Sequence, residues 1–246
     1  MRRFNLLHEM KWIEIKGGIG EQMLRYAQAM AESVRGEDVE LVCADEGLWS
    51  VFPRLPHLNM RRYTLAERVR GFKRGESEDS WLNYRYAESL GDAASTYFAT
   101  ESQILPKEFG LISEKLVGEN TVAVHVYRPG KKGSSCTPDY YNWAITGMRQ
   151  WLGDAQFVVI TDNKKLSQQC IHFGDACVEW IELAERWHKY IFELLRQASH
   201  CITSDTIESW WGAWLNKNED KIVTVPQGMD KSGSLIPYYW TVVPLT

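Results

Sequence analysis

The feature that most constrains the fold is a strand that runs through a glycine-rich turn into an amphipathic helix and a second strand. Residues 12–16 alternate in strand fashion and precede the sequence Gly17-Gly18-Ile19-Gly20. From about Glu21, apolar residues recur at spacings of three and four, which predicts a helix, and residues 39–43 predict the next strand. A strand, helix and strand in this order form a βαβ unit with parallel pairing and a right-handed crossover. The chain is therefore predicted to be of the α/β class.

The second part of the chain repeats this order with more hydrophobic strands. Residues 121–127 read T-V-A-V-H-V-Y and residues 156–161 read Q-F-V-V-I-T, which is typical of buried parallel strands. Further strands are expected at 177–182, 200–203 and 221–226. The order predicts two α/β domains, residues 1–118 and 119–246, with the boundary at Gly118-Glu119-Asn120.

Two helices are predicted between these strands. One begins at Thr137-Pro138, because a hydroxyl cap followed by proline at the first position is typical of a helix start. Its expected buried face contains Tyr141, Ala144, Ile145, Met148 and Trp151. The other covers residues 186–198, where apolar side chains again fall on one face.

The composition of the chain excludes several classes of protein. A chain of 246 residues suffices for one large or two small domains, and its net charge of −4 argues against a dedicated nucleic-acid binder. The first ten residues lack the apolar core of a secretory signal, and no run reaches the roughly 20 apolar residues of a membrane span. Five cysteines without C-x-x-C spacing predict free thiols in a reducing cytoplasm. No metal site is expected, because His and Cys never cluster at ligand spacing.

Three stretches at predicted strand ends carry groups that suit a phosphate. Gly17, Gly18 and Gly20 allow a ligand to approach the backbone closely, although a tight turn without a ligand explains them equally. The loop after residues 121–127 contains Arg128, Lys131 and Lys132, which suit a diphosphate; a solvated basic loop is the alternative.

The third stretch is Cys201–Leu215, where a short strand passes through Ser204, Asp205 and Thr206 into a helix. A helix N-terminus presents unpaired N–H groups and the positive end of a dipole, which favours an anion. The alternative is that Thr206 or Ser204 only caps the helix and that the tryptophans fill the core.

Several segments carry a resemblance to a known family. Residues 209–215 read S-W-W-G-A-W-L, residues 17–27 read G-G-I-G-E-Q-M-L-R-Y-A, and His125 and Arg128 fit the pattern H-x-R-R-x-D. Residues 140–145 and 237–240 add Y-Y-x-x-A-I and P-x-x-W. In this order the segments resemble the family 11 glycosyltransferases, the α-1,2-fucosyltransferases, over nearly the whole chain.

The resemblance implies a GT-B-like fold, two Rossmann-like domains facing across a cleft, with the acceptor on the side of residues 1–118 and the donor on the side of residues 119–246. It implies transfer of L-fucose from GDP-fucose to a glycan hydroxyl, in an α-1,2 linkage, with inversion and without a metal or cofactor. The expected partners are a nucleotide-sugar donor and an oligosaccharide or polysaccharide acceptor. A cytoplasmic location is expected, and peripheral association with the inner membrane is left open.

Site residues follow from the resemblance and from the chemistry of the reaction. The catalytic candidates are Arg128, which matches the family pattern, and Glu21 and Asp205. An acceptor hydroxyl needs a carboxylate base, and Glu21, Asp205 and Glu208 are the candidates, although all three depart from the family pattern. The donor-binding candidates are Gly18, Gly20, Gln22, His125, Asp162, Thr206 and Ser209. Among these, Asp162 stands where the family has an acidic residue able to accept from guanine N–H groups; a helix cap is its alternative role.

Five positions depart from the family pattern: Glu21 and Asp205 replace Asn, Glu208 replaces an aromatic residue, Tyr127 replaces the first Arg, and Gly130 replaces Asp. The first Arg holds the donor β-phosphate in related enzymes. A changed donor, or a non-catalytic sugar-binding relative, is therefore an alternative. An α/β hydrolase is disfavoured because the sequence has no G-x-S-x-G elbow.

Overall fold

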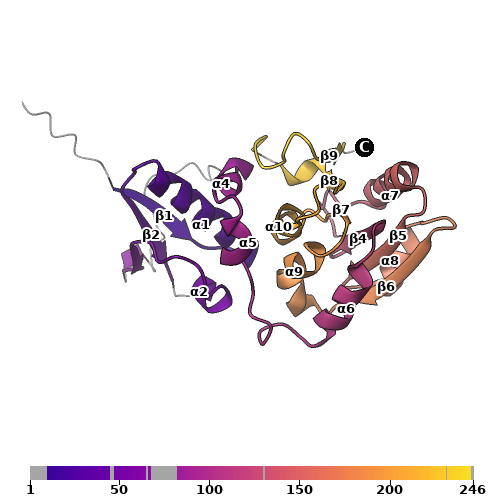
Figure 1. Cartoon of the computed structure of the whole chain (residues 1–246), viewed down its shortest axis with the longest axis horizontal. Helices are drawn as coiled ribbons and strands as arrows, with labels where there is room; N and C mark the ends of the chain where they lie inside the picture. Colours follow the sequence, from indigo (N-terminus) through magenta and orange to yellow (C-terminus); the bar gives the residue numbers. More distant parts are fainter. Residues whose placement is uncertain are drawn as a thin grey trace, which may run out of the picture. The chain divides into compact units, whose positions relative to one another are not determined.

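The computed structural model describes residues 10–44, 47–64, 66–67, 82–129, 131–230 and 232–244. Gly130 and the first nine residues, on which two of the expectations above depend, lie outside that range. The chain divides into two compact units, residues 1–99 and residues 100–246 (Figure 1). Each unit has its own parallel sheet with helices packed on it, so the predicted α/β class with two such units is confirmed. The facing of the two units across a cleft stays a prediction.

The N-terminal unit is built on the predicted βαβ element. Strand β1 (Lys11–Ile15), helix α1 (Ile19–Val34) and strand β2 (Val39–Cys43) follow one another, and β1 pairs with β2 in parallel. Strand β3 (Met60–Arg62) pairs with β2, also in parallel. Met23, Tyr26 and Ala27 of α1 are fully buried, as the apolar spacing predicts. The unit also contains α2 (Gly47–Val51), α4 (Tyr84–Ser89) and α5 (Ala93–Tyr97).

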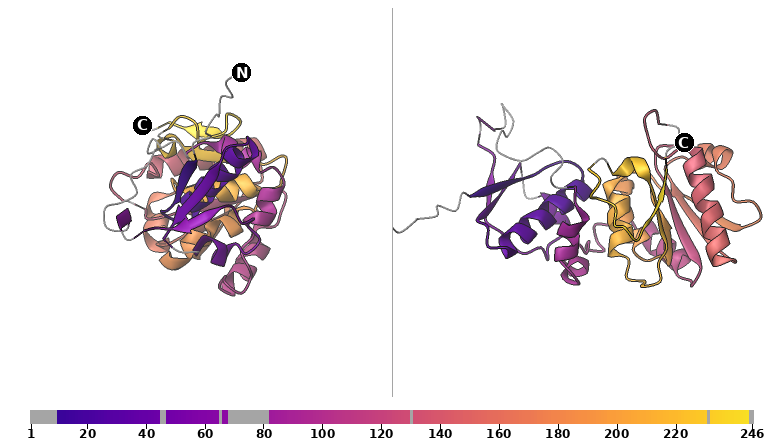
Figure 2. Two further views of the ribbon diagram at one scale, coloured as in Figure 1. Left: turned by 90° about the vertical axis from the view of Figure 1, so that its left-hand side faces the viewer. Right: turned by 90° about the horizontal axis from the view of Figure 1, so that it is seen from above.

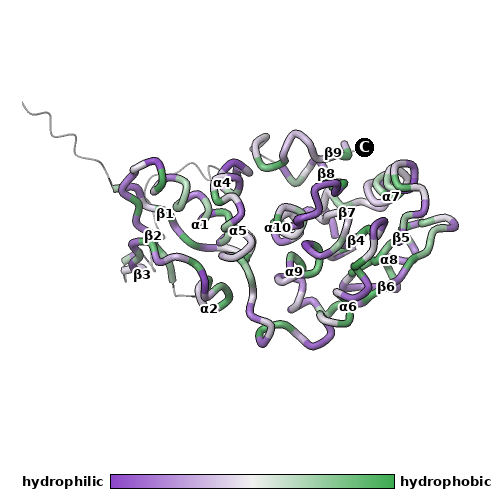
Figure 3. Tube along the Cα trace, viewed as in Figure 1, coloured by the Kyte–Doolittle hydropathy of each residue, from purple (hydrophilic) through white to green (hydrophobic). Residues whose placement is uncertain are grey.

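The C-terminal unit contains, within its described residues, a six-stranded sheet of order β6-β5-β4-β7-β8-β9. All pairings recorded in this sheet are parallel. The strands are β4 (Thr121–Val126), β5 (Gln156–Thr161), β6 (Cys177–Glu182), β7 (His200–Ile202), β8 (Val223–Pro226) and β9 (Thr241–Val243). Figure 3 colours the same trace by hydropathy, and β5, with its run F-V-V-I, is hydrophobic there.

Helices cover both faces of this sheet, with α7 on one face and α9 and α10 on the other (Figure 2). The helices of the unit are α6 (Glu108–Leu116), α7 (Pro138–Leu152), α8 (Lys164–Cys170), η1 (Glu185–Tyr190), α9 (Ile191–Leu195), α10 (Ile207–Leu215) and η2 (Gln227–Met229). Because side chains of a strand alternate, Val122, Val124 and Val126 of β4 join the core beneath α7. Ala123 and His125 therefore point to the face covered by α9 and α10.

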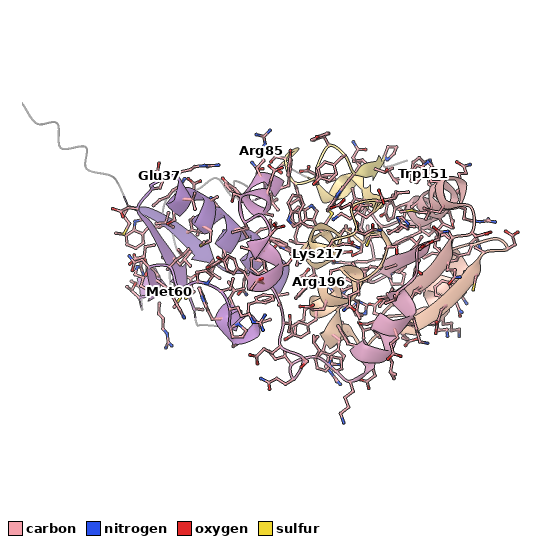
Figure 4. All side chains as sticks on the ribbon, in the orientation of Figure 1. Glu37, Met60, Arg85, Trp151, Arg196 and Lys217 are labelled. Carbon is pink, nitrogen blue, oxygen red and sulfur yellow. The ribbon has the colours of Figure 1, made fainter. Side chains whose placement is uncertain are left out.

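Helix α7 begins as predicted and ends differently. The Thr137 hydroxyl accepts a hydrogen bond from the Tyr140 N–H at 3.2 Å, and Pro138 is the first helical residue. Tyr141 and Met148 of the expected buried face are buried, but Trp151 is 48% exposed near the end of the helix (Figure 4). The Trp151 ring folds back over the preceding turn beside Gly147 instead of reaching the sheet.

The boundary between the units lies before α6, whereas the sequence predicted it after this helix. Helix α6 packs against α9 and β4, and it buries Phe109, Ile112 and Leu116. The N–H of Thr100 also donates to the Glu193 carboxylate at 2.8 Å, which ties the first residue of the unit to α9. The apolar face of α6 thus belongs to the core of the C-terminal unit.

Among the described residues, no helix combines the length and the apolar character that a membrane span requires.

Candidate functional site

The carboxyl ends of the parallel strands meet at one edge of the C-terminal sheet, and two adjoining cavities open there, lined by the segments that follow β4, β6 and β7. Open α/β sheets bind ligands at this edge. The first, called here the histidine cavity, has a volume of about 430 Å³, and the second, the basic cavity, about 380 Å³. Tyr127 and Thr206 line both. The histidine cavity is also lined by His125, Glu185, Arg186, His188, Lys189 and Glu208, and the basic cavity by Arg128, Lys131, Lys132 and Asp205.

Arg128 stands at the start of the loop that follows β4. Its φ of +49° lies in the left-handed region, which a non-glycine residue seldom adopts. The Asp162 carboxylate accepts a hydrogen bond from the Arg128 N–H at 2.9 Å and so fixes this turn. The Arg128 guanidinium lies 5.0 Å from the Tyr127 ring and forms an ion pair with Glu185.

This ion pair joins the walls of the two cavities. The hydrogen bond from the Arg128 guanidinium lowers the pKa of the Glu185 carboxyl, and the same bond raises the pKa of Arg128. Both side chains are exposed, so solvent screens their attraction and the pair is weak. A stronger anion, such as a diphosphate, can therefore compete with Glu185 for this guanidinium.

His125 is fully buried on β4, although its ring atoms border the histidine cavity. Its Nε2 lies 2.9 Å from Nδ1 of His188, and its Nδ1 lies 2.9 Å from the Ser204 hydroxyl. His188 in turn lies 2.9 Å from the carbonyl oxygen of Leu183 through its Nε2. Burial lowers the pKa of both imidazoles, and for His125 the neighbouring His188 adds to the effect. Both rings are therefore neutral near pH 7.

The turn between β7 and α10 is tightly bonded. The Thr206 hydroxyl caps α10 by accepting from the Ser209 N–H at 3.3 Å, and it lies 3.0 Å from the Ser204 hydroxyl. Ser209 is fully buried, and its hydroxyl accepts from the Ser204 N–H at 3.1 Å. The capping alternative is thus present for Thr206, which also lines both cavities.

Asp205 holds the loop that precedes α7. One of its carboxylate oxygens accepts from the Ser134 hydroxyl at 2.9 Å, the Ser135 N–H at 3.0 Å and the Ser135 hydroxyl at 3.2 Å. The structure therefore gives this carboxylate a structural role. The catalytic role assigned to it from the sequence stays a prediction.

The predicted residues near the glycine turn belong to the N-terminal unit. The Glu21 carboxylate bends back to accept from the Gly18 N–H at 2.9 Å, and the Gln22 amide donates to the Gly17 carbonyl at 3.0 Å. The carboxylate of Glu21 thus satisfies one of the N–H groups at the start of α1 that an anion would bind. Gly20 is buried within the first turn of α1.

The structure brings together one group of the predicted site residues: His125, Arg128, Asp162, Asp205, Thr206 and Ser209 surround the same sheet edge. Sequence reasoning missed His188 and Glu185. A usable signal was present, because both follow the predicted strand 177–182, and the residue after a parallel strand emerges at the same edge as those after its neighbours. Among the described residues, no three His, Cys, Asp or Glu side chains are grouped so as to hold a metal ion.

Comparison with known proteins gives distant relatives of one chemical class. No protein-family model matches the sequence. The chain is 24% identical to an α-1,2-colitosyltransferase of Escherichia coli over 86% of this chain and 89% of the relative. It is 27% identical to the O-antigen biosynthesis glycosyltransferase WbnK of Escherichia coli over 47% of this chain and 42% of that protein. The homologues therefore indicate a glycosyltransferase.

One solved structure with a similar chain trace is the ADP-heptose lipopolysaccharide heptosyltransferase II of Escherichia coli, at 12% identity and a TM-score of 0.45. The match covers 95% of this chain and 90% of that chain. This score is too low to carry an argument, so the α/β class rests on the strands and helices of the chain itself.

Proposed function

We propose that this protein is a glycosyltransferase that moves a sugar from a nucleoside-diphosphate donor to a hydroxyl group of a glycan. The observation that carries the proposal is the pair of cavities at the carboxyl edge of the sheet, lined by the segments after β4, β6 and β7, one of them containing Arg128, Lys131 and Lys132. The relation to two glycosyltransferases supports the same class of reaction.

The basic cavity is the proposed site of the diphosphate. Negative charge develops on this leaving group as the glycosidic bond breaks, and preorganised cations stabilise it. Arg128 supplies a planar pair of donors, and Lys131 lies on the same loop. Binding requires Glu185 to give up the Arg128 guanidinium, which the exposed ion pair permits.

The acceptor hydroxyl needs a base in an inverting reaction. Of the three carboxylates at the departing motif positions, Glu208 lines the histidine cavity and Asp205 lines the basic cavity, and Glu21 lies at the start of α1 in the N-terminal unit. We therefore place Glu208 beside Asp205 and Glu21 as a candidate base. Its position at the first turn of α10 brings it next to Thr206 on the wall of the histidine cavity.

The finer proposal is α-1,2 transfer of L-fucose from GDP-fucose, without a metal. The similarity to the α-1,2-colitosyltransferase supports the α-1,2 linkage, and it makes colitose an alternative to fucose as the transferred sugar. The position of Tyr127 in place of the family's first Arg also keeps the donor open, because Arg128 has to hold the phosphate from the next position.

A donor-hydrolysis panel tests the proposal without knowledge of the acceptor. The full chain is incubated with the GDP-linked forms of fucose, colitose and mannose and with UDP-glucose, in the presence of EDTA, and released nucleotide is measured. We expect hydrolysis of one GDP-sugar. Binding of GDP without hydrolysis or transfer would instead identify a non-catalytic relative, and binding of none of these ligands would remove the nucleotide site.

Substitution of the proposed phosphate ligand gives the second test. We expect Arg128→Ala to lower kcat/KM for the preferred donor by about a hundredfold, as loss of one preorganised donor to a charged transition state does. Lys165→Ala, on the exposed surface of α8, removes the same charge away from the cavities and serves as the control. Equal activity of the two variants would contradict the role of Arg128.

A further inference from the structure

An unbroken series of hydrogen bonds joins residues in and behind the wall of the histidine cavity. It joins, in order, the Leu183 carbonyl, His188, His125, the Ser204 hydroxyl and the Thr206 hydroxyl. The residues come from the loop after β6, from η1, from β4 and from the turn after β7. Thr206 is the member at the wall shared by both cavities. This series is called the relay below.

The direction of each bond in the relay follows from one fixed point. A carbonyl oxygen only accepts, so His188 carries its proton on Nε2 and, when neutral, accepts at Nδ1. His125 must then donate from Nε2 to His188 and accept at Nδ1. The Ser204 hydroxyl therefore donates its hydrogen bond to Nδ1 of His125. With no second proton, the Ser204 oxygen accepts from Thr206.

The direction depends on both rings being neutral, and their surroundings favour that form. His125 is fully buried, and its ring nitrogens meet only His188 and Ser204. The ring of Tyr127, the residue after β4, stacks on the His125 ring and lies tilted by 30° to the His188 ring. The Tyr141 hydroxyl of α7 donates to the carbonyl of His125. Asp162 and Glu185 draw His188 toward its charged form, but burial is the larger effect.

We propose that the His125–His188 pair fixes the direction of the hydrogen bonds at the cavity wall. The Ser204 and Thr206 hydroxyl protons then point inward, and Thr206 meets a ligand as a hydrogen-bond acceptor. Its oxygen already accepts the Ser209 N–H, and one further lone pair remains for a ligand. A group that donates to this oxygen carries an O–H or an N–H, which an ionised phosphate oxygen lacks. Given the proposed function, this group is assigned to a hydroxyl of the transferred sugar or of the acceptor sugar. His188 and Ser204 are then positioning residues.

This assignment separates Thr206 from the diphosphate. A phosphate oxygen can only accept hydrogen bonds at neutral pH, and the Thr206 proton is committed to Ser204. The phosphates are left to the cations of the cavities: Arg128 and the lysines of the basic cavity, with Arg186 and Lys189 of the histidine cavity beside them. The sugar hydroxyl can come from the donor or from the acceptor, and the binding experiments below distinguish these sources.

The direction of the relay is tested in solution without any ligand. Nitrogen NMR of the full chain with 15N-labelled histidine reports which ring nitrogen of each imidazole carries the proton. We expect His125 and His188 both to be neutral near pH 7, with the proton on Nε2. A proton on Nδ1 of either ring, or a charged ring, would overturn the proposed direction.

The ligand is tested by calorimetry with GDP and GDP-fucose, comparing wild type with Thr206→Val and Thr206→Ser. Loss of one hydrogen bond to a sugar hydroxyl should weaken GDP-fucose binding by about five- to tenfold in Thr206→Val, with GDP binding unchanged. Thr206→Ser, which keeps the hydroxyl, should bind both ligands as wild type does. If the hydroxyl belongs to the acceptor, Thr206→Val should instead weaken binding of methyl β-galactoside, measured by NMR with GDP present.

The variant Ser204→Ala tests positioning, because it breaks the relay while Thr206 remains. We expect it to lose the same sugar selectivity as Thr206→Val, with a melting temperature near that of wild type. Equal weakening of GDP and GDP-fucose by Thr206→Val, no change in any ligand, or full selectivity in Ser204→Ala would each overturn the proposal. A wild-type chain that binds neither nucleotide would refute the proposed guanosine-diphosphate donor, and the NMR result would still decide the direction of the relay.

Discussion

At the scale of single residues, the two buried histidines illustrate how a polar group becomes tolerable inside a core. Each ring nitrogen of His125 and His188 has a partner within 2.9 Å, so neither ring leaves a polar atom unsatisfied. An imidazolium in the same place would also need a compensating carboxylate, and none bonds directly to either ring among the contacts of the described residues. Burial therefore keeps the neutral form, and this couples folding to pH.

We predict that stability falls as the pH is lowered from about 7 to about 5.5. The folded pKa values of His125, His188 and His200, all three buried, lie below the ordinary value of 6.5, so the unfolded chain binds more protons in this window. The stabilisation is complete above the unfolded pKa and is lost below it, by about 1 kcal/mol for each histidine. Urea denaturation at the two pH values measures the difference.

The control for this prediction is His188→Gln, in which an amide keeps one donor and one acceptor but cannot titrate. Its stability should change about two-thirds as much between the two pH values, because two of the three histidines with lowered pKa remain. Carboxyl groups with lowered pKa, such as Glu67 at about 2, lose their contribution to stability only below about pH 4.5. They therefore do not affect the change in stability between pH 7 and 5.5. A stability that is flat from pH 7 to 5.5 in wild type would contradict the prediction.

At the scale of secondary-structure elements, the close packing of α10 on α9 positions the turn that carries Thr206. Gly212 faces α9, and a Cβ at this position would lie 2.5 Å from the Cβ of Leu195 and 3.0 Å from the Cα of Phe192. These neighbouring atoms are fixed to the backbone, so α10 could accommodate a methyl group only by moving away from α9. Such a movement would also displace the first turn of α10.

We predict that Gly212→Ala destabilises the protein by about 1–3 kcal/mol, as overpacking of a close helix contact does. The matched control is Gly110→Ala in α6, where a Cβ would meet no atom within 4 Å. That substitution should stabilise the protein by about 0.5–1 kcal/mol, because alanine favours a helix over glycine. Thermal unfolding of both variants provides the measurement, and a loss of equal size in the two would show that the α9–α10 contact is not responsible.

Much of the element order was predictable from the sequence, because apolar periodicity depends on local pattern. Strands 156–161 and 177–182 and the start of α7 at Thr137-Pro138 agree with the structure. The helix predicted at 186–198 is instead a 3₁₀ helix followed by a single short α-helix. His188 lies in the 3₁₀ part, and its bond to His125 joins residues 63 positions apart, which no local pattern encodes.

At the scale of the whole molecule, the chain is two units with separate cores. The site residues gathered by the structure lie in the C-terminal unit, while Gly18, Gly20, Glu21 and Gln22 lie in the N-terminal unit. The boundary escaped prediction because Gly118-Glu119-Asn120 looks like a linker in sequence. Only the tertiary contacts of α6 with α9 and β4 show that the unit begins earlier.

We predict that a fragment of residues 100–246 folds cooperatively, whereas one of residues 119–246 is less stable by about 3–6 kcal/mol. The shorter fragment lacks Phe109, Ile112 and Leu116, whose burial against α9 and β4 supplies a stabilisation of this size. Denaturation followed by circular dichroism compares the two. Equal stability of the two fragments would place the boundary of the folding unit at residue 118, as the sequence predicts.

The strand order of the C-terminal sheet has a consequence for how the chain can assemble during synthesis. Strand β4 is the first of the six to be made and occupies an interior position; β5 and β6 extend the sheet on one side, and β7, β8 and β9 extend it on the other. Each newly made strand therefore meets an open edge, and none has to insert between two partners already joined. The sheet can grow outward from β4 as the chain emerges, and the turn that carries Thr206 is completed only after β7 has docked.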